Sequence, residues 1–467
     1  MRELLGVAAS VALPWIAGAL GVAALWRERV EGRGALCIGY GYFAGLLATI
    51  LLMRLMSALG LRWSFPILAG ELIIVACAGW YVAKPLAALR TAYRRSRASL
   101  DVLPTTSRKL FWVFLALSAL SVVALACCVA WGLLQPFDVL VQWADKARVW
   151  YEHGKLVPFV DSVQWFEHGD VEQFWDRNPR YPAAVPLLQV WTALGAGRWD
   201  ESLVNVPWAM AVAALAFAFY GQVRRLDAGA AKAIVCTYLL LSIPFLQSNV
   251  AVAGMADIFV AAAYGLAAMS LWHWTRTRAW QDAALALLLA VLCALAKNEG
   301  VLWALTLAPA ALVAVRHRLG LIACATLGVA VILYLAFGPN VVTFMGYRID
   351  TRLAIVGPSV YEHLFVMDNW HLLWYSALAI IVGNARRLLG RELAPMTVTM
   401  IAGASFVLIV YFFSSAAAGI AEENLVNRFL LQIVPALAFY LIAILRDREL
   451  RAAERHSAPL APAEPAR

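Results

Sequence analysis

The chain has 467 residues, of which 63% are apolar and only 14% are charged, and its mean hydropathy is +0.73. This composition excludes a string of soluble domains and describes a chain whose main solvent is lipid. The net charge of +9 does not indicate a nucleic-acid partner, because the basic residues form short clusters between apolar runs, which is the pattern of membrane topology.

The first apolar run, residues 4–26, is long enough to cross a bilayer and has no small-residue cleavage site before Arg27. It is therefore expected to remain as a membrane span and not to be removed as a signal peptide. All seven cysteines lie within apolar runs, so no disulfide framework is expected.

Apolar segments of about 20 residues, the length that crosses a hydrocarbon core of ~30 Å, recur along the whole chain. They predict an all-α polytopic membrane protein with thirteen spans, at residues 4–26, 35–58, 65–88, 111–135, 202–223, 230–246, 250–274, 281–296, 301–315, 319–337, 370–384, 395–415 and 428–446. The pair 281–296 and 301–315 can alternatively form one hairpin of half-length helices. Segment 184–197 would break the alternation if it crossed, so it is expected to be a re-entrant or interfacial helix.

Lysine and arginine collect in every second connection between these spans. The positive-inside rule makes those connections cytoplasmic, which places the N-terminus outside and the C-terminus inside. The chain is thus divided into N-terminal helices with a basic loop (1–110), a transmembrane core with the external loop 136–183 (111–446), and a cytoplasmic, disordered tail (447–467). No Asn-x-Ser/Thr acceptor site occurs, which favours a bacterial inner membrane with its working surface facing the periplasm.

The external loop begins with an amphipathic pattern. Its apolar stripe recurs at helical spacing and comprises Val139, Leu140, Trp143, Ala147 and Trp150. The spacing predicts a helix lying on the membrane surface, with Asp138 at its start. An aspartate at that position is either a helix N-cap or a catalytic carboxylate, and the spacing does not decide between them.

Several motifs follow in order. They are Arg180-Tyr-Pro-Ala-Ala-Val-Pro-Leu187, Ala253-Gly-Met-Ala-Asp257, Leu295-Ala-Lys-Asn-Glu-Gly300 and Asn427-Arg-Phe-Leu-Leu-Gln-Ile-Val-Pro435. Together with Asp138 at the end of a span, this set resembles the GT-C superfamily of polytopic membrane glycosyltransferases, which includes protein O-mannosyltransferases and lipid A aminoarabinose transferases. The first motif differs from that family's element in having separated prolines.

The resemblance implies a sugar donor carried on a polyprenyl phosphate and an acceptor hydroxyl on a lipid, glycan or protein. It assigns Asp138 as the general base, which typically contributes ~10²–10⁴ in rate. It also implies inversion at the anomeric carbon, by attack from the opposite face of the sugar. Arg428 is expected to bind the donor phosphate, because a guanidinium at headgroup depth suits a phosphate. Lys297 is either a second phosphate ligand or a side chain that snorkels from a helix end.

Further candidates surround these residues. A lone charge costs ~2.5–3.5 kcal/mol at the bilayer centre, so Asp257, expected about two turns inside its span, is either a second acid of the site or a partner for Lys297. Glu299 is a site residue or a helix cap. Asp145, Arg180 and Tyr181 on the external loop are candidate supporting or acceptor-binding residues.

No cofactor is predicted with certainty. The external loop carries a group of possible metal ligands, namely Asp161, Glu167, His168, Asp170, Glu172 and Asp176. Their spacing matches no fixed coordination geometry, so a divalent metal is possible but not expected, and no metal-binding residue is assigned. No phosphate-binding loop or dinucleotide fingerprint is present, which disfavours a nucleotide-linked donor.

Three other functions remain open at this stage. A secondary transporter would place charged or helix-breaking elements near the membrane midplane, whereas a polymerase or ligase of lipid-linked glycans would differ only in donor size. A non-catalytic scaffold would need no ordered set of acids and bases. The sequence also predicts a structural ion pair between Arg54 and Glu71, which lie at similar depth in neighbouring spans.

Overall fold

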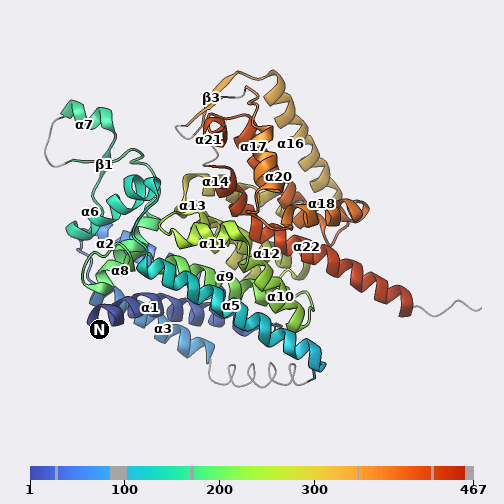
Figure 1. Ribbon diagram of the computed structural model, residues 1–467, viewed down its shortest axis with the longest axis horizontal. Coiled ribbons are helices and arrows are strands. Elements are labelled where there is room, and N and C mark those ends of the chain that lie inside the picture. Colours follow the sequence, from blue (N-terminus) through green and yellow to red (C-terminus); the bar gives the residue numbers. More distant parts are fainter. Residues whose placement is uncertain are drawn as a thin grey trace, which may run out of the picture.

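The computed structural model describes residues 1–26, 30–84, 102–168, 173–344, 347–350, 352–421 and 425–457. The first part of the chain is helical apart from one parallel pair of two-residue strands in the loop (Figure 1). Its elements are α1 (Arg2–Leu25), α2 (Arg33–Ala58), α3 (Phe65–Ala83), α5 (Thr105–Trp131), η1 (Val139–Ala144), α6 (Asp145–His153), β1 (Phe159–Val160), α7 (Ser162–His168), β2 (Phe174–Trp175), α8 (Ala184–Ala196), η2 (Leu203–Asn205) and α9 (Val206–Arg224).

The second part continues the helical bundle and adds one antiparallel hairpin, in which Val341 pairs with Asp350. Its elements are α10 (Ala230–Leu241), α11 (Pro244–Ala251), α12 (Asp257–Thr277), α13 (Trp280–Ala296), α14 (Asn298–Leu305), α15 (Ala308–Val315), α16 (His317–Phe337), β3 (Val341–Phe344), β4 (Tyr347–Asp350), α17 (Gly357–Tyr361), η3 (Glu362–Val366), α18 (Leu373–Gly383), α19 (Ala385–Leu388), α20 (Ala394–Phe412), α21 (Ala417–Ala421) and α22 (Val426–Ser457).

Ten helical segments in the described ranges are long and apolar enough to cross a membrane. An eleventh crossing results if α10 and α11, which meet at a bend of 59°, form one span. The chain is therefore an all-α integral membrane protein, as the composition predicts. The helices α13 and α18 coincide with two further predicted spans, but they are shorter than a full crossing.

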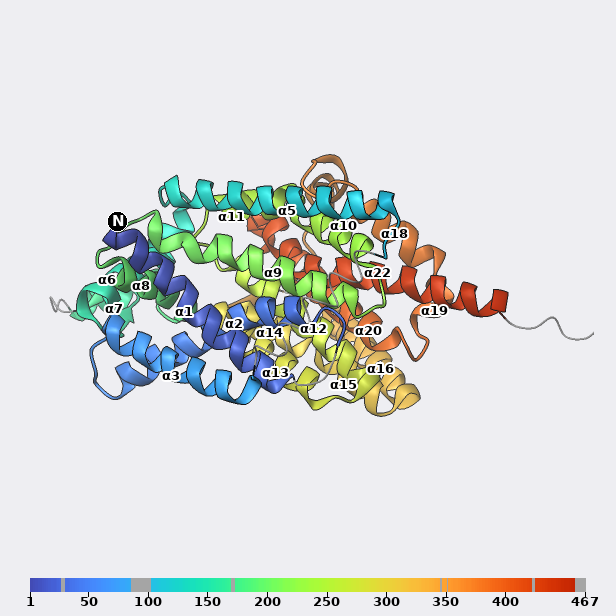
Figure 2. The ribbon, with the colours of Figure 1, turned by 90° about the horizontal axis from the view of Figure 1, so that it is seen from below.

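The two ends of the bundle differ. The N-terminus lies with α6, α7 and α8 at one end, here called the loop end, while α22 leaves the bundle at the other, here called the tail end (Figures 1 and 2). This arrangement agrees with the predicted placement of the N-terminus and the loop 136–183 on the same side. The predicted disordered tail 447–467 is helical as far as Ser457, the last residue of α22, which corrects that prediction, and residues 458–467 lie outside the described residues.

Helix α12 lies at the centre of the bundle, and 83% of its apolar 18-residue stretch is buried. Its sequence is dominated by alanine, and these small side chains let α9, α13 and α22 pack closely around it. Helices surrounded in this way lose contact with lipid, so polar groups on them must find partners inside the protein. All seven cysteines lie in described segments and are free, as predicted.

The predicted pair of Arg54 and Glu71 is wrong. Helix α3 packs mainly against α1 and not against α2, and α1 approaches α2 closely because Gly45 lies against the backbone of Pro14. The buried Oε2 atom of Glu71 is unpaired, while Arg54 is exposed. Helices α2 and α3 are neighbours in sequence but pack only weakly against each other.

The predicted surface helix of the loop is also corrected. It is divided into the π-helical turn η1 and the helix α6, and its apolar residues Val139, Trp143 and Ala147 are buried within the protein core. Helix α8, the predicted re-entrant segment, covers this face and is itself almost entirely buried. The stripe therefore packs against protein, and only Leu140 remains exposed.

A buried ion pair fixes the rest of the loop. Lys146 Nζ lies 3.1 Å from Asp176 Oδ1 and donates to the carbonyl of Asn178 at 2.7 Å. Burial raises the pKa of Asp176 and lowers that of Lys146, and their mutual attraction opposes both shifts. The pair ties the start of α6 to the segment after β2, so these two parts of the loop are held together.

Candidate functional site

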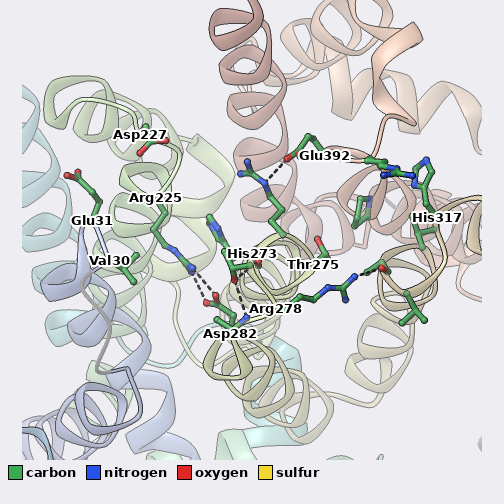
Figure 3. A pocket seen from close by; sticks show the side chains of 18 of the residues that line it. Val30, Glu31, Arg225, Asp227, His273, Thr275, Arg278, Asp282, His317 and Glu392 are labelled. Carbon is green, nitrogen blue, oxygen red and sulfur yellow. Dashed lines mark hydrogen bonds and ion pairs between the residues drawn. The ribbon is translucent and has the colours of Figure 1, made fainter. Parts of the chain in front are cut away.

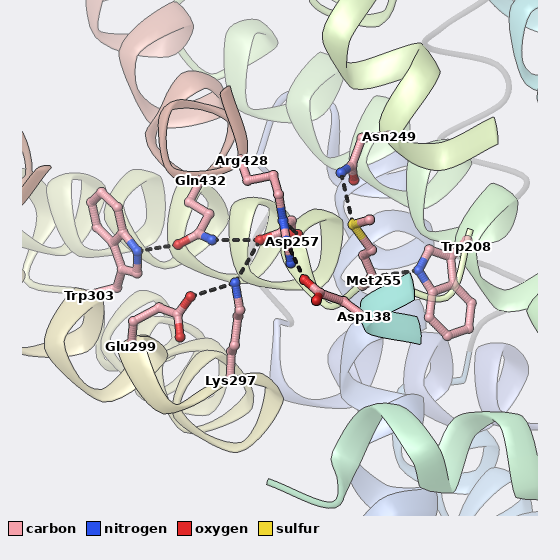
Figure 4. Close-up of polar contacts among 10 residues, drawn as sticks. All are labelled: Asp138, Trp208, Asn249, Met255, Asp257, Lys297, Glu299, Trp303, Arg428 and Gln432. Carbon is pink, nitrogen blue, oxygen red and sulfur yellow. Dashed lines mark hydrogen bonds and ion pairs between the residues drawn. The ribbon is translucent and has the colours of Figure 1, made fainter. Parts of the chain in front are cut away.

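Five of the predicted site residues meet in one polar cluster at the loop end of α12 (Figure 4). Arg428 Nη1 lies 2.6 Å from Asp138 Oδ2, and Arg428 Nε lies 3.0 Å from Asp257 Oδ2. Lys297 Nζ lies 3.0 Å from Asp257 Oδ1 and 2.5 Å from Glu299 Oε1. Asp257 thus joins both cations, which is one of the two alternatives expected for it.

Each charged residue stands where a helix begins or breaks. Asp257 is the first residue of α12 and not a residue two turns inside a span, which corrects the predicted boundary. Lys297 occupies the extended break between α13 and α14 (φ −154°, ψ 153°), and Arg428 is in the first turn of α22. Helix starts offer unpaired N–H groups and a positive dipole, so acids at these positions are favourable.

A tight turn brings Asp138 to the cluster. Gly254 has a φ of +85°, and a Cβ atom there would collide with the side chain of Val139, the residue after Asp138. Trp208 fixes the same turn by donating from Nε1 to the Met255 carbonyl at 2.7 Å (Figure 4). Only glycine permits this backbone conformation and this close approach together.

Asp138 is not a helix cap. Its side chain makes no capping hydrogen bond to the turn that follows; instead its carboxylate accepts from Arg428. The structural alternative that the sequence left open is therefore excluded in this conformation. The catalytic alternative is not tested by this contact, because a salt bridge alone can also be structural.

Two members of the cluster were not predicted. Gln432 donates to Asp257 Oδ1 at 2.8 Å, and Trp303 Nε1 donates to Gln432 Oε1 at 2.5 Å. Gln432 lies four residues after Arg428, so the helical repeat places both on one face of α22, and this spacing was a usable signal. No such signal marked Trp303, because a tryptophan in an apolar helix is expected to be an ordinary core residue.

The start of α22 is held from a second side. Asn427 Nδ2 contacts His363 Nδ1 at 2.8 Å, and Trp370 Nε1 donates to Asn427 Oδ1 at 3.1 Å. These contacts tie α22 to the segment around η3. Arg428 therefore projects from a firmly positioned backbone.

The cluster is acidic and open on one side only. Three carboxylates face two cations, which gives a formal charge of −1. The Asp257 side chain is fully buried and that of Arg428 is 12% exposed, whereas the Asp138 side chain is 33% exposed. Asp138 is thus the member that an external reactant can reach most readily.

The remaining predicted residues lie elsewhere. Asp145 begins α6 and is exposed, away from the cluster. Arg180 and Tyr181 line a separate pocket of about 480 Å³, and the Tyr181 ring meets Trp143 edge-on at 5.1 Å. The structure therefore divides the predicted set into a charged cluster and a neighbouring loop pocket.

The possible metal ligands of the loop are not assembled. Among the residues that the structure describes, no three histidine, cysteine, aspartate or glutamate side chains come together as a metal site. Asp176 is engaged by Lys146, and Asp170 and Glu172 lie outside the described residues.

A different pocket, of about 820 Å³, opens at the tail end of α12 (Figure 3). Arg225 binds Asp282 there through two contacts of 2.8 Å and stacks on Trp26 at 4.8 Å. Because α12 has 21 residues, this pocket lies about 30 Å along the helix from Asp257. It contains none of the predicted site residues.

Comparison with protein-family models, with curated proteins and with solved structures gives no match. No relative therefore indicates a reaction, and the proposal below rests on the residues of the site itself.

Proposed function

We propose that this protein is a membrane glycosyltransferase that moves a sugar from a polyprenyl-phosphate donor to an acceptor hydroxyl on a lipid, glycan or protein. The observation that carries the proposal is the contact of Asp138, a partly exposed carboxylate at the membrane edge, with Arg428 over a buried Asp257. A base held in place by a buried cation is what transfer to a hydroxyl requires.

In the proposed reaction the acceptor O–H donates its proton to Asp138 while its oxygen forms a bond to the anomeric carbon. The bond from that carbon to the phosphate oxygen breaks, and the lipid phosphate leaves with the electron pair. Attack and departure occur on opposite faces of the sugar, so the configuration inverts. Oδ1 of Asp138 is the atom assigned to the proton, because Oδ2 accepts from Arg428.

Arg428 and Lys297 are proposed to face the leaving phosphate, as the sequence indicates, and Arg428 also positions Asp138. Asp257 and Glu299 hold these two cations in place, and Gln432 donates a hydrogen bond to Asp257. The helix starts that gather here lie at the loop end, which we assign to the periplasmic face of a bacterial inner membrane. Counting α13 and α18 as crossings, together with the bent pair α10 and α11, gives thirteen spans and keeps the predicted alternation.

A secondary transporter is the second candidate, supported by a specific feature. Helices α10 and α11 meet at a bend of 59°, and the backbone is interrupted at Lys297 between α13 and α14. Broken helices beside buried charges are typical of transport sites. The partly exposed carboxylate of Asp138 at the start of the loop, however, suits an acceptor-binding enzyme better than this alternative.

The decisive measurement is transfer of labelled sugar from a polyprenyl-phosphate donor by the purified full chain in lipid nanodiscs. Wild type should form labelled acceptor, and Asp138→Asn should lower turnover by about 10²–10⁴-fold, since the amide keeps size and hydrogen bonding but cannot take the proton. Arg62→Gln, a change of an exposed residue at the same end, is the control. Full activity of Asp138→Asn, or substrate flux in vesicles without transfer, would contradict the proposal.

A further inference from the structure

The second feature of the loop end is the pocket beside Tyr181. Its lining combines two arginines, Arg54 from α2 and Arg180 from the loop, with aromatic, aliphatic and proline side chains, among them Trp150 and Leu295. None of its lining residues is acidic. At about 480 Å³ it falls within the range of small-molecule binding sites.

Neither arginine of this pocket has an acidic partner in the described parts of the chain. No hydrogen bond or ion pair joins the guanidinium of Arg54 or Arg180 to another residue in the described parts of the chain, and both side chains are exposed. This contrasts with Arg428 and Lys297, each of which contacts two carboxylates. The pocket therefore has the free positive charge that the acidic cluster lacks.

The depth of Arg54 fits a lipid phosphate. Arg54 lies four residues before Ala58, the last residue of α2, so it is about 6 Å below the end of the helix. That is headgroup depth and not the centre of the hydrocarbon.

The pocket adjoins the cluster on two sides. Leu295 in its wall precedes Lys297 by two residues, and Tyr181 touches Trp143 of η1, the turn that starts after Asp138. A ligand in the pocket would thus lie beside both segments that carry cluster residues.

We propose that Arg54 and Arg180 form the docking site for the polyprenyl monophosphate that leaves when the sugar is transferred, an inference that rests on the proposed function. A sugar linked to a polyprenyl phosphate is a phosphodiester with a single negative charge, and loss of the sugar leaves a monoester of about −1.5 to −2. Two unpaired guanidinium groups match the charge that develops on the leaving phosphate. Arg428 and Lys297 each already contact two carboxylates of the cluster, so the additional charge on the leaving phosphate calls for further cations beside them.

The two arginines should also discriminate between phosphate-containing ligands by their charge. Common phospholipid headgroups such as phosphatidylglycerol are phosphodiesters and offer one charge, so they should bind this pair of arginines less tightly than undecaprenyl phosphate does. Inorganic phosphate carries a similar charge but has no hydrocarbon chain to contact the apolar walls of the pocket. The proposed ligand of the pocket is therefore the polyprenyl monophosphate.

The test measures binding of undecaprenyl phosphate to the purified full chain by native mass spectrometry from phosphatidylcholine nanodiscs, with phosphatidylglycerol and inorganic phosphate in parallel arms. Arg54→Gln and Arg180→Gln should each weaken binding of undecaprenyl phosphate by about 10-fold, because each removes a charge-assisted contact. Arg54→Lys should recover part of the loss, and the exposed Arg62→Gln should change nothing.

Unchanged affinity in both glutamine variants would overturn the inference, as would equal binding of phosphatidylglycerol or inorganic phosphate. The donor-transfer assay separates this failure from failure of the proposed function. If wild type transfers sugar and the arginine variants keep their kcat/KM, the docking site is wrong and the enzyme assignment stands. If undecaprenyl phosphate binds through the arginines but no sugar moves, the docking site stands and the transferase assignment fails.

Discussion

At each end of α12 a buried arginine contacts aspartate, but the two arginines differ in the number of their partners and in the exposure of those partners. At the tail end, Arg225 gives both contacts of its guanidinium to the single carboxylate of Asp282, and the two side chains are 6% and 0% exposed. At the loop end, Arg428 is shared between Asp257, which is buried, and Asp138, which is 33% exposed. The first arrangement is closed and neutral, whereas the second is open and carries excess negative charge.

This difference shows which ion pair is structural. In the pair stacked on Trp26, both terminal nitrogens of Arg225 and both carboxylate oxygens of Asp282 are committed to one another. A cation shared between two acids leaves one of them free to exchange partners. The contrast between Arg225 and Arg428 therefore supports the proposal that the chemistry takes place at the loop end.

The largest expected effect comes from removing a buried carboxylate at either end. Asp257→Ala leaves Lys297 and Arg428 without their shared partner, and Asp282→Ala leaves Arg225 unpaired, so each should lower the stability of the folded protein by about 3–5 kcal/mol. Thermal unfolding in detergent, followed by the fluorescence of the 19 tryptophans, measures both. A stability like that of wild type for Asp257→Ala would show that the buried cluster is not needed for the fold.

A smaller effect is expected at the turn that seats Asp138. Gly254→Ala introduces a Cβ atom into Val139 at a positive φ, which should destabilise the protein by about 1–3 kcal/mol and displace η1. Gly229→Ala is the matched control, because no atom stands near a Cβ at that position. The same unfolding assay compares the two, and equal melting temperatures would exclude a close approach of η1 to the turn.

Asp138→Asn should change stability less, by no more than about 1 kcal/mol. Its side chain is partly exposed, Arg428 keeps its contact with Asp257, and the amide oxygen can still accept a hydrogen bond. Together with the large loss of turnover expected for the same variant, this separates a catalytic role from a structural one. A destabilisation as large as that of Asp257→Ala would instead make Asp138 part of the structural core.

The smallest effect is expected for an exposed pair at the tail-end pocket. Arg276 and Glu392 are 39% and 50% exposed at a separation of 2.8 Å, so Glu392→Gln should change stability by about 0–1 kcal/mol. Chemical denaturation at low and high salt resolves this, and the difference should shrink as salt screens the pair. A larger, salt-independent loss would mean that this pocket is as tightly built as the pair Arg225 and Asp282.

Much of the architecture follows from local sequence. Apolar runs of membrane length, interrupted by charged or proline-containing connections, are sufficient to predict the helices, because lipid leaves the backbone few alternatives to a helix. The polar residues at the ends of those runs were recognisable for the same reason, since a charge such as Asp257 inside an apolar chain needs a partner. Lys297, Glu299 and Arg428 were predicted on this ground, and the structure brings them into one cluster with Asp257.

Which of those residues meet was decided by the tertiary structure alone. Spacing placed Arg54 beside Glu71, but α3 packs mainly against α1. The same Arg54 instead lines a pocket with Arg180, far away in the sequence. The contact of Asp138 with Arg428 joins residues 290 positions apart. Packing of long helices fixes such pairs through shape and volume across many residues, and no local pattern records that information.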